Sequence, residues 1–268
     1  SYYFFVFWVG HFNISLLREN GRMQLIKLSA TDSTNAYLRR LSRRESVPDF
    51  TVVQAAYQTA GRGQPGTDWV AEEGKNLTFS VLKAFDAVPS DRQFLLNIRT
   101  ALAVSGVLEG LKIPGVRVKW PNDILSGGKK VCGILVENQL KGSHLVQSII
   151  GIGLNVNQTA FRGLPHATSL KIAAGSAFDL DELLYALITA LQKALGRGGS
   201  ASDTADWQAY ERQLYLKDEP ALFSRPGGAP FAGTIRGVDP GGRLRVEMED
   251  GREEAFGFKE IRYLTKNA

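Results

Sequence analysis

Cysteine is nearly absent from this sequence of 268 residues, and a single thiol excludes an internal disulfide. Cys132 sits in a strand-like apolar run, so we expect a small buried hydrophobic side chain rather than a reactive thiol. A chain without disulfides is compatible with a reducing compartment, and we therefore expect a cytoplasmic protein. Histidine is also scarce. Metal-ligand spacing is absent among His11, His144 and His166, which argues against a histidine-based metal centre.

Apolar runs long enough to cross a bilayer, which takes ~20 residues, are missing as well. The aromatic run S-Y-Y-F-F-V-F-W-V at residues 1–9 is too short, and it lacks the basic start and the cleavage site of a signal peptide. We expect residues 1–22 to be an upstream or non-native extension without a functional role, followed by a functional chain from Met23. No membrane partner is expected.

Long blocks of basic residues are lacking too, although the net charge is +5. We therefore expect no nucleic-acid partner. One basic cluster falls at helical spacing and comprises Arg39, Arg40, Arg43 and Arg44. We favour a solvated helix face for it, with contact to an acidic partner or a phosphate as the alternative.

The pattern of apolar residues predicts a mixture of strands and helices. Strands are expected at residues 24–28, 50–56, 76–82, 116–119 and 145–156, with a hairpin formed by 124–125 and 131–137. Helices are expected just after residues 33–35 and at 91–111, 180–195 and 203–216. From about Asp218 onward, short strands alternate with tight turns, which predicts a small β-barrel of about fifty residues.

The most informative segment present is a glycine-rich loop, Q-T-A-G-R-G-Q-P-G-T-D-W, from Gln58 to Trp69. Glycine allows backbone N–H groups to approach a ligand closely, and arginine adds a planar fork that suits phosphate or carboxylate. The motifs K-W-P-N-D (Lys119–Asp123) and K-K-V-C-G-I-L-V-E (Lys129–Glu137) follow along the chain. Their lysines would complete a clamp around an anion.

These motifs, preceded by S-T-N at residues 33–35, resemble the biotin protein ligases over roughly residues 23–265. The resemblance implies an α+β fold: a mixed β-sheet flanked by helices, of the class II synthetase or biotin ligase type, plus a C-terminal SH3-like barrel. The expected domains are a catalytic domain at 23–216 and the barrel at 217–268. The implied cofactors and substrates are ATP, Mg²⁺ and biotin.

The resemblance also implies a reaction in two steps. Biotin and ATP form biotinyl-5′-AMP and pyrophosphate, and a lysine of a biotin carboxyl carrier protein or carboxylase biotin domain then takes the biotinyl group. Neither step needs a nucleophile from the enzyme, so positioning and charge neutralisation should dominate. The implied catalytic residues are Arg62, Lys119 and Lys130.

Further site residues are implied by the same resemblance. The biotin-binding set is Ser33, Thr34, Asn35, Gln58, Gly61, Arg62, Gln64, Lys130 and Gly133. The set for ATP or the adenylate is Trp69, Lys119, Asn122, Gly151, Gly153 and Asn155. Gln64 departs from the arginine that often stands at that place in the family, and weaker retention of the adenylate is one consequence that we consider.

Several of these residues have an alternative interpretation. Asp123, with Asn122, could hold Mg²⁺, or its carboxylate could cap a turn. Ser33 or Thr34 could be the N-cap of the following helix. Lys129 is expected to face solvent, because neighbouring strand residues point to opposite faces, and Trp120 is expected in the core.

Two other functions are weighed against the ligase. A lipoate ligase or octanoyltransferase shares the fold but lacks the pair of the glycine-rich loop and K-W-P-N-D. A non-catalytic biotin-binding regulator would be favoured only without Arg62 or Lys130, and both are present. The expected assembly is a monomer or a homodimer.

Overall fold

The computed structural model describes residues 3–9, 12–19, 23–196 and 200–264, with the side chains of 3–23, 87 and 200–201 left out of the description. Its helices are Thr34–Arg44 (α1), Phe94–Gly110 (α2), Leu170–Ala174 (α3), Leu180–Leu195 (α4) and Ser200–Gln213 (α5), with a 3-10 turn at Ser90–Arg92 (η1). The strands of the larger sheet are Tyr3–Val9 (β1), Phe12–Glu19 (β2), Met23–Thr31 (β3), Thr51–Gln58 (β4), Leu77–Pro89 (β5), Val116–Lys119 (β6), Asp123–Ser126 (β7), Lys129–Lys141 (β8) and His144–Leu154 (β9).

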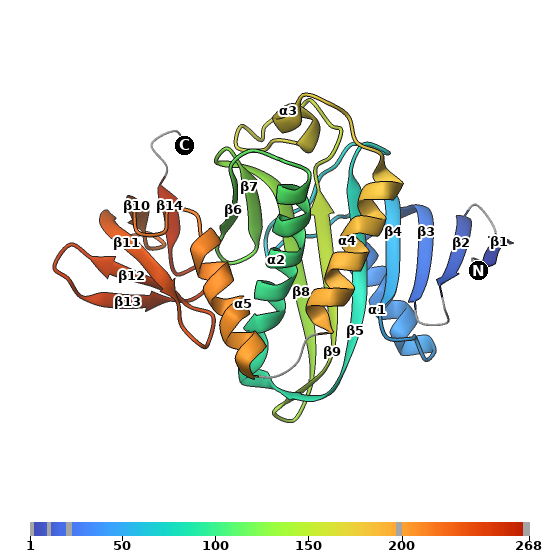
Figure 1. Ribbon diagram of the computed structural model, residues 1–268, viewed down its shortest axis with the longest axis horizontal. Helices are drawn as coiled ribbons and strands as arrows, with labels where there is room; N and C mark the ends of the chain where they lie inside the picture. The colour runs from blue at the N-terminus through green and yellow to red at the C-terminus, as the bar shows by residue number, and fades with distance from the viewer. Residues whose placement is uncertain (1–2, 10–11, 20–22, 197–199, 265–268) are drawn as a thin grey trace.

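The larger sheet is mixed, as predicted. Its strand order is β1-β2-β3-β4-β5-β9-β8-β7-β6 (Figure 1). The pairing of β3 with β4 is parallel, because α1 carries the chain back between them, and the other pairs of neighbouring strands are antiparallel. β9 and β8 form a hairpin, whereas β5 lies beside β9 although α2 and strands β6 to β8 come between them along the chain.

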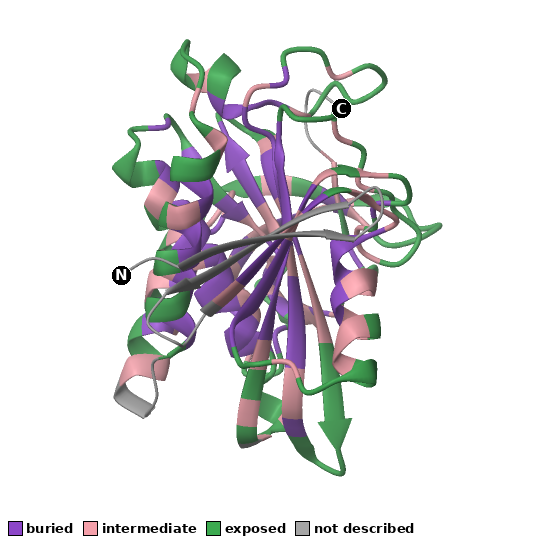
Figure 2. Ribbon diagram, turned by 90° about the vertical axis from the view of Figure 1, so that its right-hand side faces the viewer, coloured by how far each residue is buried: buried purple, intermediate pink, exposed green. Residues whose placement is uncertain are grey.

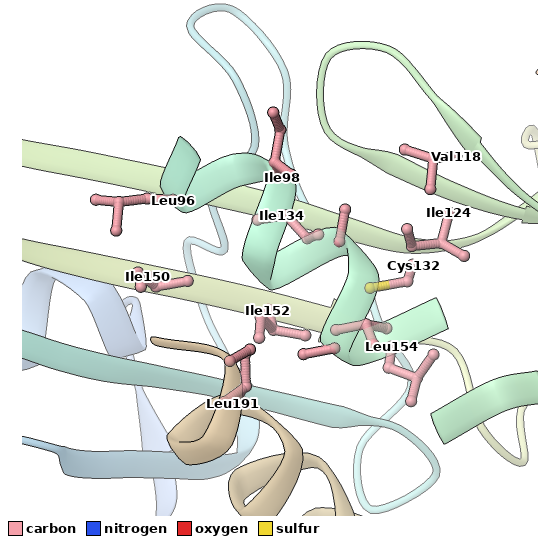
Figure 3. Close-up of a cluster of buried hydrophobic side chains, with 14 of the residues drawn as sticks. Leu96, Ile98, Val118, Ile124, Cys132, Ile134, Ile150, Ile152, Leu154 and Leu191 are labelled. Atoms are coloured by element: carbon pink, nitrogen blue, oxygen red, sulfur yellow. The ribbon is translucent and has the colours of Figure 1, made fainter. Parts of the chain in front are cut away.

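Helices cover both faces of this sheet. α1 packs on one face, where Leu38 belongs to an apolar cluster that includes Val53 and Ile149. α2 and α4 pack on the opposite face over the main core, where Cys132 is fully buried, as predicted (Figure 3). Burial raises the pKa of the Cys132 thiol, which suits an inert core residue. Figure 2 shows the strands buried along much of their length, with the outer helix surfaces exposed.

A second, five-stranded antiparallel sheet forms the C-terminal part, as the barrel prediction requires. Its strands are Pro220–Ser224 (β10), Pro230–Val238 (β11), Leu244–Met248 (β12), Glu253–Phe256 (β13) and Arg262–Leu264 (β14). α5 lies between the two sheets (Figure 1). The buried Trp120, predicted to be in the core, links them directly, because its Nε1 donates to the Gly242 carbonyl at 2.9 Å.

The expected elements are present, with differences at their ends. α4 has the expected bounds, α5 begins at Ser200 rather than at 203, and α3 was not expected. α3 is only five residues long, and its N-cap Ser169 and C-cap Gly175 define it more than any apolar pattern. The backbone of residues 16–19 in β2 pairs with β3, so part of the predicted extension continues the sheet. Within the described residues, no helix is long and apolar enough to span a membrane.

Candidate functional site

A pocket of about 270 Å³ opens on the face of the large sheet that carries α1. The first turn of α1, the glycine-rich loop, the K-W-P-N-D turn and strands β5, β8 and β9 contribute to its walls. Thirteen of the predicted site residues line it: Ser33, Thr34, Asn35, Gln58, Arg62, Gln64, Trp69, Asn122, Asp123, Lys130, Gly133, Gly151 and Gly153. Motifs that are distant along the chain therefore meet in one cavity.

The floor of the pocket consists of two rows of residues from three adjacent strands, and every one of them except Leu135 is Gly, Ser or Thr. Ser80, Gly151 and Leu135 form one row across β5, β9 and β8. The next row consists of Thr78, Gly153 and Gly133. Because alternate residues of a strand share a face, both rows point away from the core under α2 and α4.

The glycines of this floor make room for specific side chains. A Cβ on Gly153 would lie only 2.3 Å from the Trp69 ring, and one on Gly133 would lie 3.2 Å from the same ring. A Cβ on Gly151 would lie 2.4 Å from Asn35 Oδ1. Trp69 and Asn35 can therefore pack directly against the sheet only because these floor positions lack side chains.

The glycine-rich loop folds back on itself above the floor. Gly63 N donates to Thr67 O at 2.9 Å, and Trp69 N donates to Gly61 O at 3.0 Å. Arg62 is exposed on this turn, and its backbone forms an isolated antiparallel β-bridge with that of Asp68. The turn thus holds the indole against the sheet and leaves the guanidinium accessible at the mouth of the pocket.

One end of the pocket is a hydrogen-bonded polar cluster. The Thr34 N–H and hydroxyl donate to Gln58 Oε1 at 2.8 and 3.1 Å. Ser80 Oγ lies 2.7 Å from Thr34 Oγ1 and 2.5 Å from Asn35 Oδ1. Ser33 occupies the N-cap position of α1, but its side chain makes no capping hydrogen bond. Its hydroxyl therefore belongs to the pocket wall rather than to the helix end.

Cations gather at the other end. Lys130 Nζ lies 2.7 Å from Asp123 Oδ1 and 5.8 Å from the centroid of the Trp69 ring. Its neighbour Lys129 is exposed, as expected. Lys119 Nζ lies 4.9 Å from the ring centroid of Tyr263, a residue of β14. Burial lowers the pKa of Lys119, with nearby Lys130 adding to the effect and Asp123 opposing it.

Three predicted residues lie outside the lining of the pocket. Lys119 does not line the pocket, and its ammonium lies over the Tyr263 ring. Gly61 packs against the Trp69 carbonyl. Asn155 is buried, and its Nδ2 donates to the Thr168 carbonyl at 3.0 Å. Asn155 thus joins the end of β9 to the segment that leads into α3.

Metal ligands are sparse around the pocket. Among the described residues, no three His, Cys, Asp or Glu side chains are grouped closely enough to hold an ion. Asp123 and the Asn122 amide provide hard oxygens, and Asn122 is fixed by donating from Nδ2 to the Ile134 carbonyl at 2.6 Å. Such a set could hold a cation only together with oxygens from a ligand.

Sequence reasoning missed Thr78 and Phe258, which line the pocket. It also missed Ser80 and Glu137, which contact the Asn35 amide. Thr78 and Ser80 alternate with apolar residues in a buried strand, and this period-2 pattern was an available signal. Phe258 follows β13 and reaches the pocket from the other sheet. No local pattern in the sequence indicates that placement.

Comparison with known proteins adds independent findings. The model of the Biotin/lipoate A/B protein ligase family matches residues 28–155. The chain is 33% identical to a biotin--[acetyl-CoA-carboxylase] ligase of Paracoccus denitrificans over 236 residues, covering 84% of this chain and 95% of the relative. It is 31% identical over 234 residues to the Mycobacterium tuberculosis protein of the same name, covering 85% of each.

Solved structures resemble the fold as well. One is a biotin protein ligase from Aquifex aeolicus in complex with biotin and ATP. Its TM-score is 0.72 at 28% identity, and the match covers 90% of this chain and 99% of that one.

Proposed function

Because this chain belongs to the biotin protein ligases, we propose that the pocket under the glycine-rich loop binds biotin and ATP end to end. The protein is an ATP-dependent ligase that activates biotin to biotinyl-5′-AMP and transfers the biotinyl group to a lysine of a biotin carboxyl carrier protein. The observation that carries our assignment is a cavity with a neutral polar cluster at one end and the Lys130–Asp123 pair at the other.

The polar cluster is suited to the ureido ring of biotin. That ring carries one carbonyl acceptor and two N–H donors, so it needs matched partners when water is excluded. Gln58 Oε1 is already committed to Thr34, which leaves Gln58 Nε2 as a donor. The hydroxyl of Ser33 and the amide of Asn35 complete the set of polar groups at this end.

The cationic end is suited to the chemistry. In the first step, a carboxylate oxygen of biotin bonds to the α-phosphorus of ATP, and the bond to the pyrophosphate oxygen breaks. Lys130 would neutralise the carboxylate and α-phosphate oxygens that react. Lys119 would neutralise the other phosphates of ATP. Arg62 would cover the adenylate from the loop as a planar fork. In the second step, a carrier lysine amine attacks the biotinyl carbonyl and releases AMP.

Mg²⁺ fits this site as an ion carried mainly by ATP. Asp123 and the Asn122 amide oxygen would be its protein ligands, and the ion would offset phosphate charge. Asp123 now pairs with Lys130, so the same carboxylate would serve either the ion or the lysine. The Asp123→Asn variant distinguishes the two roles of Asp123. A metal ligand predicts an altered Mg²⁺ dependence of the reaction, and a turn cap predicts an unchanged one.

We also propose that residues 23–216 form the catalytic domain and 217–268 a C-terminal domain that closes one side of the site. The separate five-stranded sheet supports this division. The contact of Phe258 with the pocket and the packing of Tyr263 on Lys119 support closure of the site by the C-terminal domain.

The test is transfer to a carrier. The purified protein is incubated with ATP, Mg²⁺, biotin and a carboxylase biotin domain, and the carrier is weighed by mass spectrometry. We expect one biotinyl group on one lysine, and none when that lysine is replaced by arginine. An unmodified carrier under all conditions would contradict the proposed function.

A further inference from the structure

Behind the polar end of the pocket lies a charged pair that holds one of its walls. Glu137 on β8 forms an ion pair with Arg39 of α1. Glu137 Oε2 also accepts a hydrogen bond of 2.8 Å from Asn35 Nδ2. Glu137 occupies the row of the sheet next to that of Gly151 and Ser80, with Leu82 and Ile149 as its neighbours across the strands.

This pair determines which way the Asn35 amide points. A carboxylate only accepts hydrogen bonds, so both Glu137 oxygens take donors, one from Arg39 and one from Asn35. Asn35 must therefore turn Nδ2 towards Glu137 and Oδ1 towards Ser80, whose Oγ is 2.5 Å away. Asn35 and Ser80 are both buried, so water cannot replace a mismatched partner without cost.

We propose that Glu137, supported by Arg39, is a positioning residue that fixes the hydrogen-bond polarity of the biotin end of the pocket. The inference rests on the proposed function, because the amide that Glu137 orients lines the cavity assigned to the ureido ring. With Nδ2 donating to Glu137 and to the Leu135 carbonyl, the Asn35 amide offers a ureido N–H an acceptor, Oδ1. The dithiolane ring of lipoate has no N–H or carbonyl and gains nothing from that orientation.

A charge-conserving exchange tests this directly. Glu137→Gln leaves one acceptor for two donors. The carbonyl of the new amide goes to Arg39, and its NH₂ meets the Asn35 NH₂. Asn35→Asp alone places two carboxylates together. The double variant Asn35→Asp/Glu137→Gln restores both contacts, with an acceptor again facing Ser80 and the total charge unchanged.

The readout is ATP–pyrophosphate exchange with biotin and ATP varied separately. Each single variant should raise the KM for biotin about tenfold, which corresponds to about 1.4 kcal/mol. The KM for ATP should stay within twofold of wild type. The double variant should recover the KM for biotin to within threefold of wild type.

Glu249→Gln, at an exposed turn of the C-terminal sheet, is the matched control and should leave both KM values unchanged. Thermal melting of every variant separates positioning from unfolding. An unchanged KM for biotin in Glu137→Gln, or equal loss for biotin and ATP without rescue in the double variant, would overturn the inference. Wild-type protein that exchanges with lipoate and not with biotin would instead overturn the proposed function.

Discussion

The Lys130 ammonium and the Asp123 carboxylate lie 2.7 Å apart at the cationic end of the pocket. Both side chains retain some exposure, so their pairing contributes little to folding. We infer that Asp123 holds the Lys130 ammonium in position until an anionic ligand replaces the carboxylate as its partner. Lys130 is therefore expected to matter for activity and to contribute little to folding stability.

Replacement of Lys130 tests that separation. Lys130→Ala should lower adenylate formation by about 100-fold or more, because a charge aimed at the reacting oxygens is lost. Its thermal unfolding should stay close to that of wild type. Single-turnover formation of biotinyl-5′-AMP is the measurement, with exposed Lys129→Ala as the neighbouring control. A wild-type rate in Lys130→Ala would remove the role assigned to this lysine.

Gly153 is the floor position with the least space. In Gly153→Ala, the new Cβ would meet the Trp69 ring at 2.3 Å, so the indole and its loop must shift. We expect at least a tenfold loss of adenylate formation. Gly106→Ala in α2 meets nothing within 4 Å and should instead stabilise the protein by about 0.5–1 kcal/mol. Equal behaviour of the two variants in both assays would refute the packing argument.

At the scale of elements, the glycine-rich loop joins the end of β4 to the floor of the pocket. It is held by its own backbone hydrogen bonds and by Trp69, while Arg62 is exposed. A loop held by its own hydrogen bonds and one anchoring side chain can rearrange around a ligand at low cost. Trypsin cleavage after Arg62 measures this closure, because a closed loop is cleaved more slowly.

Limited proteolysis should therefore depend on ligands. We expect trypsin to cleave after Arg62 in the free protein and to do so several-fold more slowly with biotin and ATP together. Mass spectrometry of the fragments identifies the site, and cleavage elsewhere on the surface provides the internal control. Equal cleavage after Arg62 with and without ligands would show that the loop does not close.

The arrangement of the elements also explains which site residues could be predicted from the sequence and which could not. Apolar β-branched runs predicted β4, β5 and β9, and the motifs predicted the residues that meet at the pocket. Ser80 and Glu137 were missed because their roles depend on β5, β9 and β8 being neighbours. The pairing of β5 with β9 joins segments about seventy residues apart, so the alternation around Ser80 indicates the face that it shares but not the residues beside it. Asn155, predicted at the adenylate, is placed outside the pocket lining by its bond to the Thr168 carbonyl.

At the scale of the whole molecule, the two sheets meet through specific contacts. Trp120 Nε1 donates to the Gly242 carbonyl, and a Cβ on Gly242 would lie 2.4 Å from the Phe94 ring. Phe94 in turn packs against Tyr210 of α5 with ring centroids 6.0 Å apart. This continuity predicts that both parts unfold together.

Trp120→Phe probes the junction. The variant leaves the Gly242 carbonyl without its donor, which should cost about 1–3 kcal/mol of unfolding free energy. Urea unfolding should keep a single transition by fluorescence and circular dichroism. Trp207→Phe, which removes the same atoms beside Phe94, is the control and should cost less. Two separate transitions in the wild-type protein would contradict a continuous junction.

The central claim, that one pocket activates biotin on ATP, is tested most directly by ATP–pyrophosphate exchange with Mg²⁺, with biotin and lipoate supplied separately. The account predicts exchange with biotin and none with lipoate, because the buried polar cluster needs a ureido partner. Exchange with lipoate alone, or tight biotin binding without any exchange, would contradict it.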